Sequence, residues 1–134
     1  MNPEALGLPH REPFVFVDAL TAREPGVSAT CRTVFQPERD FFRGHFPGDP
    51  LVPGVILTEA LAQTAGLAVG EPGVSFRLAA IKGMKFLAAV RPGEEVVLHA
   101  RKLGAVGSVW QFEVTARVAG RVVAEGAIVL SAAS

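Results

Sequence analysis

The segment VILTEALAQTAGLAVG, residues 55–70, constrains the fold more than any other part of this chain. It contains no proline and many strong helix formers, and Pro53-Gly54 precedes it, where proline is tolerated because the first turn of a helix does not need its N–H. Gly70 ends the predicted helix. The helix is apolar nearly all round, so other elements must wrap it. Its few polar residues share roughly one side: Thr58, Glu59, Gln63 and Thr64.

Strand patterns fill most of the remaining chain. Residues 14–22 and 27–35 are rich in β-branched and aromatic side chains, and the turn sequence Glu24-Pro25-Gly26 separates them, so they predict two strands. Residues 36–54 contain too many prolines and glycines for regular structure, apart from a short helical turn expected at 40–42. Four more strand patterns follow the helix, at 77–86, 95–103, 108–118 and 121–132. We therefore predict an α+β fold, an antiparallel sheet of about five to six strands wrapped around one long central helix.

Length and composition limit the organisation of the chain. Its 134 residues predict a single domain over 1–134. The hydrophobic fraction of 49% is high for a small monomer, so part of the apolar surface is expected to be buried against a second copy. Lys and Arg number 13, as do Asp and Glu, and this balance argues against a nucleic-acid or anionic-membrane partner.

The single cysteine and the apolar segment both favour a cytoplasmic protein. Cys31 has no partner for an intrachain disulfide and no metal-ligand spacing around it, so we interpret it as a small buried residue. No signal-peptide pattern is visible at the N-terminus. The longest apolar run, residues 52–69, is interrupted by Pro53, Glu59 and Gln63, and it reads as a buried helix and not as a membrane span.

The segment GHFPGDPLVPGVILTEALAQTAG, residues 44–66, places a histidine and a carboxylate around a Pro- and Gly-rich turn. It closely resembles the active-site segment of the β-hydroxyacyl-acyl carrier protein dehydratases of bacterial type II fatty-acid synthesis, which are hotdog-fold enzymes. About a dozen positions match at fixed spacing. The likeness extends over nearly the whole chain, with further matching stretches at LPHREPFVFVD (8–18), VRPGEEV (90–96) and RVVAEGAIVL (121–130).

The chemistry implied by this resemblance is the conversion of (3R)-3-hydroxyacyl thioesters to trans-2-enoyl thioesters. It needs a base for the C2 proton, an acid for the C3 hydroxyl and a group that holds the enolate-like oxygen. His45 suits the base, because an imidazole with a pKa near 6.5 is largely neutral at about pH 7. Glu59 suits the acid if apolar burial raises its pKa above about 4.3. Gly54 suits the group that holds the enolate-like oxygen, because it lies at the start of the predicted helix, where N–H groups lack intrahelical partners.

The resemblance also implies how the site is assembled. In the family a loop carbonyl holds the second nitrogen of the histidine, and here that carbonyl belongs to Leu51. His45 and Glu59 are expected to act together across a homodimer interface, with two sites per dimer at the mouths of apolar tunnels. Some relatives form trimers of dimers. Gln63 lies one turn after Glu59, so it is expected to hydrogen-bond the carboxyl or to line the same pocket. The substrate arrives on the phosphopantetheine arm of acyl carrier protein, and no other cofactor or metal is implied.

Two positions depart from the family pattern, and two alternative functions stay open. Glu12 stands where an aromatic residue is usual, and Leu87-Ala88-Ala89 replaces a common basic pair on the acyl-entry side. The glutamate at position 59 favours the plain dehydratase, since the related dehydratase-isomerase uses aspartate there. The alternatives are a hotdog acyl-thioesterase and a non-catalytic acyl-binding subunit of a heteromeric dehydratase. We assign no catalytic role to His10 or to His99.

Overall fold

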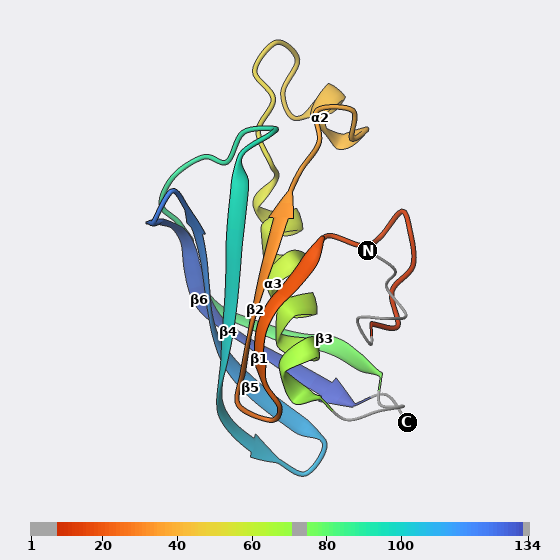
Figure 1. Ribbon diagram of the computed structural model, residues 1–134, viewed down its shortest axis with the longest axis vertical. Helices are drawn as coiled ribbons and strands as arrows, with labels where there is room; N and C mark the ends of the chain where they lie inside the picture. The colour runs from red at the N-terminus through yellow and green to blue at the C-terminus, as the bar shows by residue number, and fades with distance from the viewer. Residues whose placement is uncertain (1–7, 71–74, 133–134) are drawn as a thin grey trace.

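The computed structural model describes residues 8–70 and 75–132. These residues form six strands, one short helix and one long helix (Figure 1). In chain order the elements are β1 (Ala19–Glu24), β2 (Ser28–Val34), α2 (Phe41–Gly44), α3 (Gly54–Val69), β3 (Phe76–Phe86), β4 (Glu95–Val106), β5 (Val109–Val118) and β6 (Arg121–Ala132).

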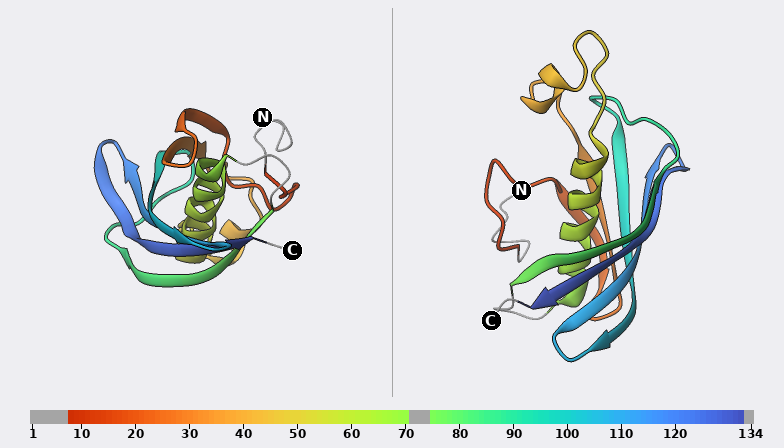
Figure 2. Two further views of the ribbon diagram at one scale, coloured as in Figure 1. Left: turned by 90° about the horizontal axis from the view of Figure 1, so that it is seen from below. Right: turned by 180° about the vertical axis from the view of Figure 1, so that it is seen from behind.

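The strands form one antiparallel sheet in the order β1-β2-β4-β5-β6-β3. The sheet curves around α3, which lies against its concave face and contacts every strand (Figure 2). The predicted α+β architecture is therefore confirmed, with six strands and one central helix. No helix in the described ranges is long and apolar enough to cross a membrane.

Strict alternation of side chains explains why only one face of the sheet carries the core. In β4, Val96, Leu98 and Ala100 are buried, while the residues between them are more exposed. Successive strand residues point to opposite faces, so this pattern provides one apolar surface for α3 and one surface for water. The helix contributes Leu61 and Ala65, which have no exposed surface. Further fully enclosed strand residues of this core are Cys31, Val114, Ala116, Ala124 and Ile128.

The first predicted strand, at 14–22, is wrong at its N-terminal end, because β1 covers only Ala19–Glu24. The buried side chain of Gln63, in α3, forms hydrogen bonds with backbone groups that would otherwise pair with a neighbouring strand. Its Oε1 accepts the N–H of Phe16 at 3.0 Å, and its Nε2 donates to the carbonyl of Phe14 at 3.1 Å. The segment before β1 is therefore fastened to the helix by a side chain that lies 47 positions away.

The other boundaries lie close to their predicted positions. Helix α3 ends at Val69, and the C-cap residue Gly70 has a φ of +69°, in the left-handed region that glycine adopts without strain. The helical turn expected at 40–42 is present as α2. Strand β4 continues to Val106, so a two-residue turn replaces the longer connection expected at 104–107. The turn expected at Glu71–Gly73 lies outside the described residues.

Replacing Gln63 tests its role as a fastener. In a Gln63→Leu variant the buried N–H of Phe16 and the part-buried carbonyl of Phe14 both lose their partner, and an orphaned buried group costs about 1–3 kcal/mol. We expect the free energy of unfolding to fall by about 2–4 kcal/mol, measured by urea denaturation at a fixed protein concentration.

The matched control is Gln36→Leu, because Gln36 is exposed in a loop. That substitution is expected to change the free energy of unfolding by less than about 0.5 kcal/mol. Equal effects of the two substitutions would contradict the account of Gln63.

Candidate active site

The loop that carries His45 is held closed by backbone hydrogen bonds. The carbonyl of His45 accepts the N–H of Leu51 at 2.8 Å, and Phe46 and Asp49 exchange a pair of backbone bonds inside this turn at 2.9 and 3.1 Å. Asp49 also forms a 2.7 Å ion pair with Arg91, which follows the end of the adjacent segment 87–90. These contacts fix the imidazole relative to the start of α3.

The same loop sets the tautomer of His45. Its Nδ1 lies 3.0 Å from the carbonyl oxygen of Leu51, which can only accept a hydrogen bond, so Nδ1 carries the proton. The lone pair is then on Nε2, which is the atom a base would use. The half-buried ring stacks on Phe46 with 4.1 Å between centroids. His45 thus has the contact that the resemblance implied for the base.

Gly54 begins α3 beside this imidazole. The N–H groups of Ile56 and Leu57 bond to the carbonyl of Pro53, at 3.0 and 3.1 Å, whereas those of Gly54 and Val55 have no backbone partner among the described residues. Gly54 and His45 line one pocket, together with Leu51, Val52, Leu57 and the segment 86–90. Backbone N–H groups at the positive end of a helix suit an oxygen that gains negative charge.

The ring of Phe86 lies directly on Gly54. A Cβ added at Gly54 would lie 3.0–3.2 Å from three atoms of this ring, which is tighter than ordinary packing. Phe86 is 49% exposed, so the ring can move more easily than a core side chain. A larger residue at this position would have to displace the ring, whereas glycine leaves room for a close approach by a ligand.

Glu59 differs from the other polar residues of α3 because the fold does not use its carboxyl. The hydroxyls of Thr58 and Thr64 donate to helix carbonyls one turn earlier, both at 2.9 Å, and the amide of Gln63 holds the segment before β1. The Oε2 atom of Glu59 is buried without a hydrogen-bond partner among the described residues. Burial raises the pKa of Glu59 above its usual range, so the carboxyl keeps its proton to higher pH than an exposed glutamate does.

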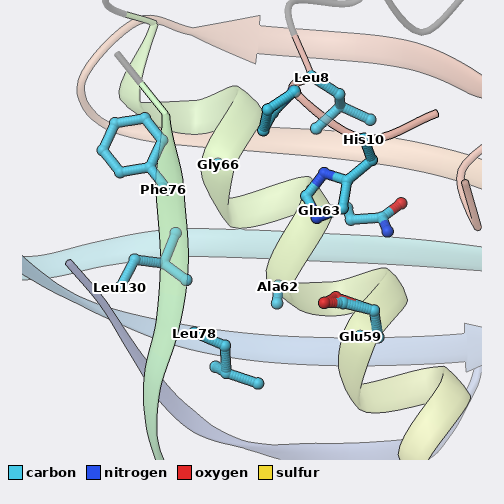
Figure 3. A pocket seen from close by; sticks show the side chains of 10 residues that line it. Leu8, His10, Glu59, Ala62, Gln63, Gly66, Phe76, Leu78 and Leu130 are labelled. Atoms are coloured by element: carbon cyan, nitrogen blue, oxygen red, sulfur yellow. The ribbon is translucent and has the colours of Figure 1, made fainter. Parts of the chain in front are cut away.

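The carboxyl of Glu59 faces a second pocket, on another side of α3. Figure 3 shows Glu59, Ala62 and Gln63 along one side of the helix, with Leu78 of β3 and Leu130 of β6 across the space from them. The wall of this pocket is mostly apolar, with Glu59, Gln63 and His10 as its polar side chains, as is typical of sites that bind an apolar ligand. The remaining lining residues are Leu8, Pro9, Gly66 and Phe76.

Within one chain the predicted site residues fall into two groups. His45, Leu51 and Gly54 line one pocket, whereas Glu59 and Gln63 line the other. Gln63 shares the pocket of Glu59, but its amide atoms bond to backbone groups and not to the carboxyl. Within one chain, the pocket of His45 therefore contains no Glu59, and the pocket of Glu59 contains no His45.

Two residues near these pockets received no role from the sequence. His10 lines the pocket of Glu59, and Phe86 covers Gly54. Both contacts join distant parts of the chain, so no local pattern indicates them. His99 lies in the sheet and forms a 2.8 Å hydrogen bond with the hydroxyl of Thr30. Burial raises the pKa of the Cys31 thiol to about 11, so this thiol stays protonated.

Comparison with known proteins gives the family. The model of the ApeI-like family, described as ApeI dehydratase, matches residues 21–127. The 3-hydroxyacyl-[acyl-carrier-protein] dehydratase FabZ of Acidiphilium cryptum is 39% identical over 124 residues, which are 88% of this chain and 75% of that protein. The FabZ of Ruminiclostridium cellulolyticum is 42% identical over 128 residues, 90% and 88% of the two chains. This chain belongs to the FabZ and ApeI-like dehydratase family.

Solved structures share the fold of this dehydratase family at low sequence identity. The dehydratase heterocomplex ApeI:P from Xenorhabdus doucetiae has a TM-score of 0.84 at 17% identity and covers all of this chain and 92% of its own. The fluoroacetyl-CoA thioesterase FlK has a TM-score of 0.70 at 17% identity, with coverage of 84% and 90%. Hotdog-fold dehydratases and thioesterases therefore share one architecture, and the side chains in the two pockets must decide the chemistry.

The contact between Gly54 and Phe86 can be tested by unfolding. In Gly54→Ala the new methyl group overpacks against the ring, and we expect the free energy of unfolding to fall by about 1–2 kcal/mol. In a Phe86→Ala background the same substitution is expected to be neutral or slightly stabilising, because alanine is a better helix former than glycine. Chemical denaturation of the unmodified protein, the two single variants and the double variant gives the coupling energy between positions 54 and 86.

Gly44→Ala is the matched control, since a Cβ at Gly44 meets no other atom within 4 Å. It is expected to have the same small effect with or without the Phe86 ring. The account fails if Gly54→Ala is equally costly in both backgrounds.

Proposed function

We propose that this protein dehydrates (3R)-3-hydroxyacyl thioesters, carried on acyl carrier protein, to trans-2-enoyl thioesters in fatty-acid elongation. It acts as a homodimer with two sites, each built from His45 of one copy and Glu59 of the other. One observation carries the proposal. An imidazole with its Nε2 lone pair free and a buried carboxyl with an unpartnered oxygen line different pockets of one chain, so each is half of an acid–base pair.

The two pockets divide the substrate between them. The thioester lies in the pocket of His45, where its oxygen accepts hydrogen bonds at the start of α3 near Gly54. The acyl tail enters the apolar pocket of the partner copy, past Glu59 and between α3 and the strands that carry Leu78 and Leu130. C2 then faces His45, and C3 with its hydroxyl faces Glu59.

The reaction moves two protons and breaks two bonds, C2–H and C3–O. Nε2 of His45 takes the proton from C2, and the electrons of that C–H bond form the C2–C3 double bond. The C3–O bond breaks as the hydroxyl receives the proton of Glu59, and water leaves. Exchange with solvent then returns a proton to Glu59 and removes one from His45. The raised pKa of Glu59 favours this role, because a buried carboxyl is protonated more often at neutral pH.

Exposed apolar side chains support the dimer. Strand β3 is at the edge of the sheet, so one side of its backbone is unpaired, and its residues Leu78 and Ile81 are 37% and 53% exposed. Unprotected edge strands with apolar side chains tend to pair with another chain. A second copy on this edge would cover both side chains and would bring a second α3 towards the first.

The carrier reaches the site past the segment 87–89. Leu87, Ala88 and Ala89 line the pocket of His45, where many relatives have a basic pair. We therefore propose that apolar contacts carry more of the docking here than charge does. The acid, the base and the helix N-terminus complete the reaction, so we propose no cofactor beyond the phosphopantetheine arm and place the enzyme in the cytoplasm.

A product assay tests the proposed function. Purified protein is incubated with 3-hydroxybutyryl and 3-hydroxydecanoyl thioesters on acyl carrier protein and on coenzyme A, and the enoyl product is followed by ultraviolet absorbance. We expect turnover on the acyl carrier protein substrates. Loss of the base in His45→Ala or of the acid in Glu59→Gln is expected to lower kcat by about 10²–10⁴-fold.

The same samples separate the alternatives. Release of free thiol without enoyl product would indicate a thioesterase. Binding of acyl carrier protein without turnover, with activity only after a second hotdog-fold subunit is added, would indicate a non-catalytic subunit of a heteromeric enzyme. Either result contradicts the proposed homodimeric dehydratase.

A further inference from the structure

The pocket of Glu59 contains a second polar atom that the proposed mechanism does not use. Among the described residues, two buried side-chain atoms lack hydrogen-bond partners, Oε2 of Glu59 and Nδ1 of His10. Both residues line the same pocket. Buried polar atoms in native proteins are nearly always paired, so these two atoms are expected to share a polar partner, either a water or a polar group of a ligand.

Gln63 also lines this pocket, and each end of its amide already bonds to the backbone, at Phe14 and at Phe16. The rest of the wall is mainly aliphatic or aromatic, as Ala62 and Leu78 illustrate. A molecule that fits has an apolar body and one polar group near Glu59 and His10, and the 3-hydroxyacyl chain has this composition.

His10 is held in place from several directions. Its ring stacks on that of Phe14, with centroids 6.2 Å apart, and the carbonyl of Phe14 is held in turn by Gln63 of α3. The guanidinium of Arg11 donates to the carbonyls of His10 and Leu8, both at 2.9 Å. Figure 3 shows the imidazole beside Gln63, with Glu59 farther along the same side of α3. His10 is therefore held in the segment before β1, which Gln63 fastens to the same helix that carries Glu59.

We infer that His10 and Glu59 together form a polar subsite for the 3-hydroxyl group of the substrate. The hydroxyl oxygen accepts the hydrogen bond of the protonated Glu59, and the hydroxyl hydrogen is donated to Nδ1 of His10. When the C3–O bond breaks, the proton of Glu59 moves to the leaving oxygen, and the water that forms donates to both residues. His10 neither gains nor loses a proton in this step.

The protonation state of His10 agrees with this arrangement. Burial lowers its pKa, so the ring is neutral at neutral pH and one of its nitrogens is an acceptor. The inference rests on the proposed function, because it names the contact that the hydroxyl of that substrate would make.

Substitutions of His10 test the subsite. His10→Phe keeps the ring shape and the stacking on Phe14 but removes Nδ1, whereas His10→Asn keeps a polar atom near the same place. We expect His10→Phe to lower kcat about tenfold with KM changed by less than about threefold, and His10→Asn to retain most of the activity. The loss is expected to be equal for 3-hydroxybutyryl and 3-hydroxydecanoyl substrates, because both carry the same hydroxyl group.

His99→Phe is the matched control, since His99 pairs with Thr30 in the sheet and lines neither pocket. Unaltered kcat in His10→Phe, a loss confined to the longer substrate, or an equal loss in His10→Asn would each overturn the inference. If His10→Phe does not fold, His10→Leu removes the same atom. Absence of turnover in the unmodified protein would instead overturn the proposed function, so the two failures are distinguishable.

Discussion

The burial of α3 inside a curved sheet is the constraint on which the rest of the structure depends. The helix contacts every strand, so a polar side chain on its buried faces must find a partner without water. Thr58 and Thr64 bond back to the helix, and Gln63 bonds to the segment before β1. Glu59 alone among them keeps a buried oxygen without a partner, in a surrounding that raises its pKa. A buried carboxyl oxygen without a partner among the described residues costs folding free energy, and carboxyls with a raised pKa are typical of functional sites.

Much of the fold follows from local pattern, and the site follows only in part. The apolar helix and the alternation of its flanking strands are encoded in neighbouring residues, so their boundaries are predicted closely. The first strand is predicted wrongly, because its backbone is diverted by Gln63, a partner 47 positions away. His45 and Leu51 are six residues apart in one loop, and the family resemblance includes their contact. His10 beside the pocket of Glu59 and Phe86 over Gly54 depend on the folded chain, and no local period indicates them.

The division of the site into two halves connects the fold to the proposed function. His45 and the start of α3 line one pocket, and Glu59 lines the other, apolar pocket. The exposed edge of β3 offers a surface through which two such chains can combine their halves. Dimerisation would then bury the excess of apolar residues and complete catalysis through the same interface.

Mixing two inactive variants tests this division most directly. His45→Ala and Glu59→Gln are unfolded together, refolded as a mixture and assayed, with a tag on one variant to confirm that mixed dimers form. In a mixed dimer one site has lost both groups and the other has kept both. Random pairing makes about half of the dimers mixed, so the account predicts recovery of about one quarter of the activity of the unmodified protein. A mixture that contains mixed dimers but stays as inactive as either variant alone would contradict it.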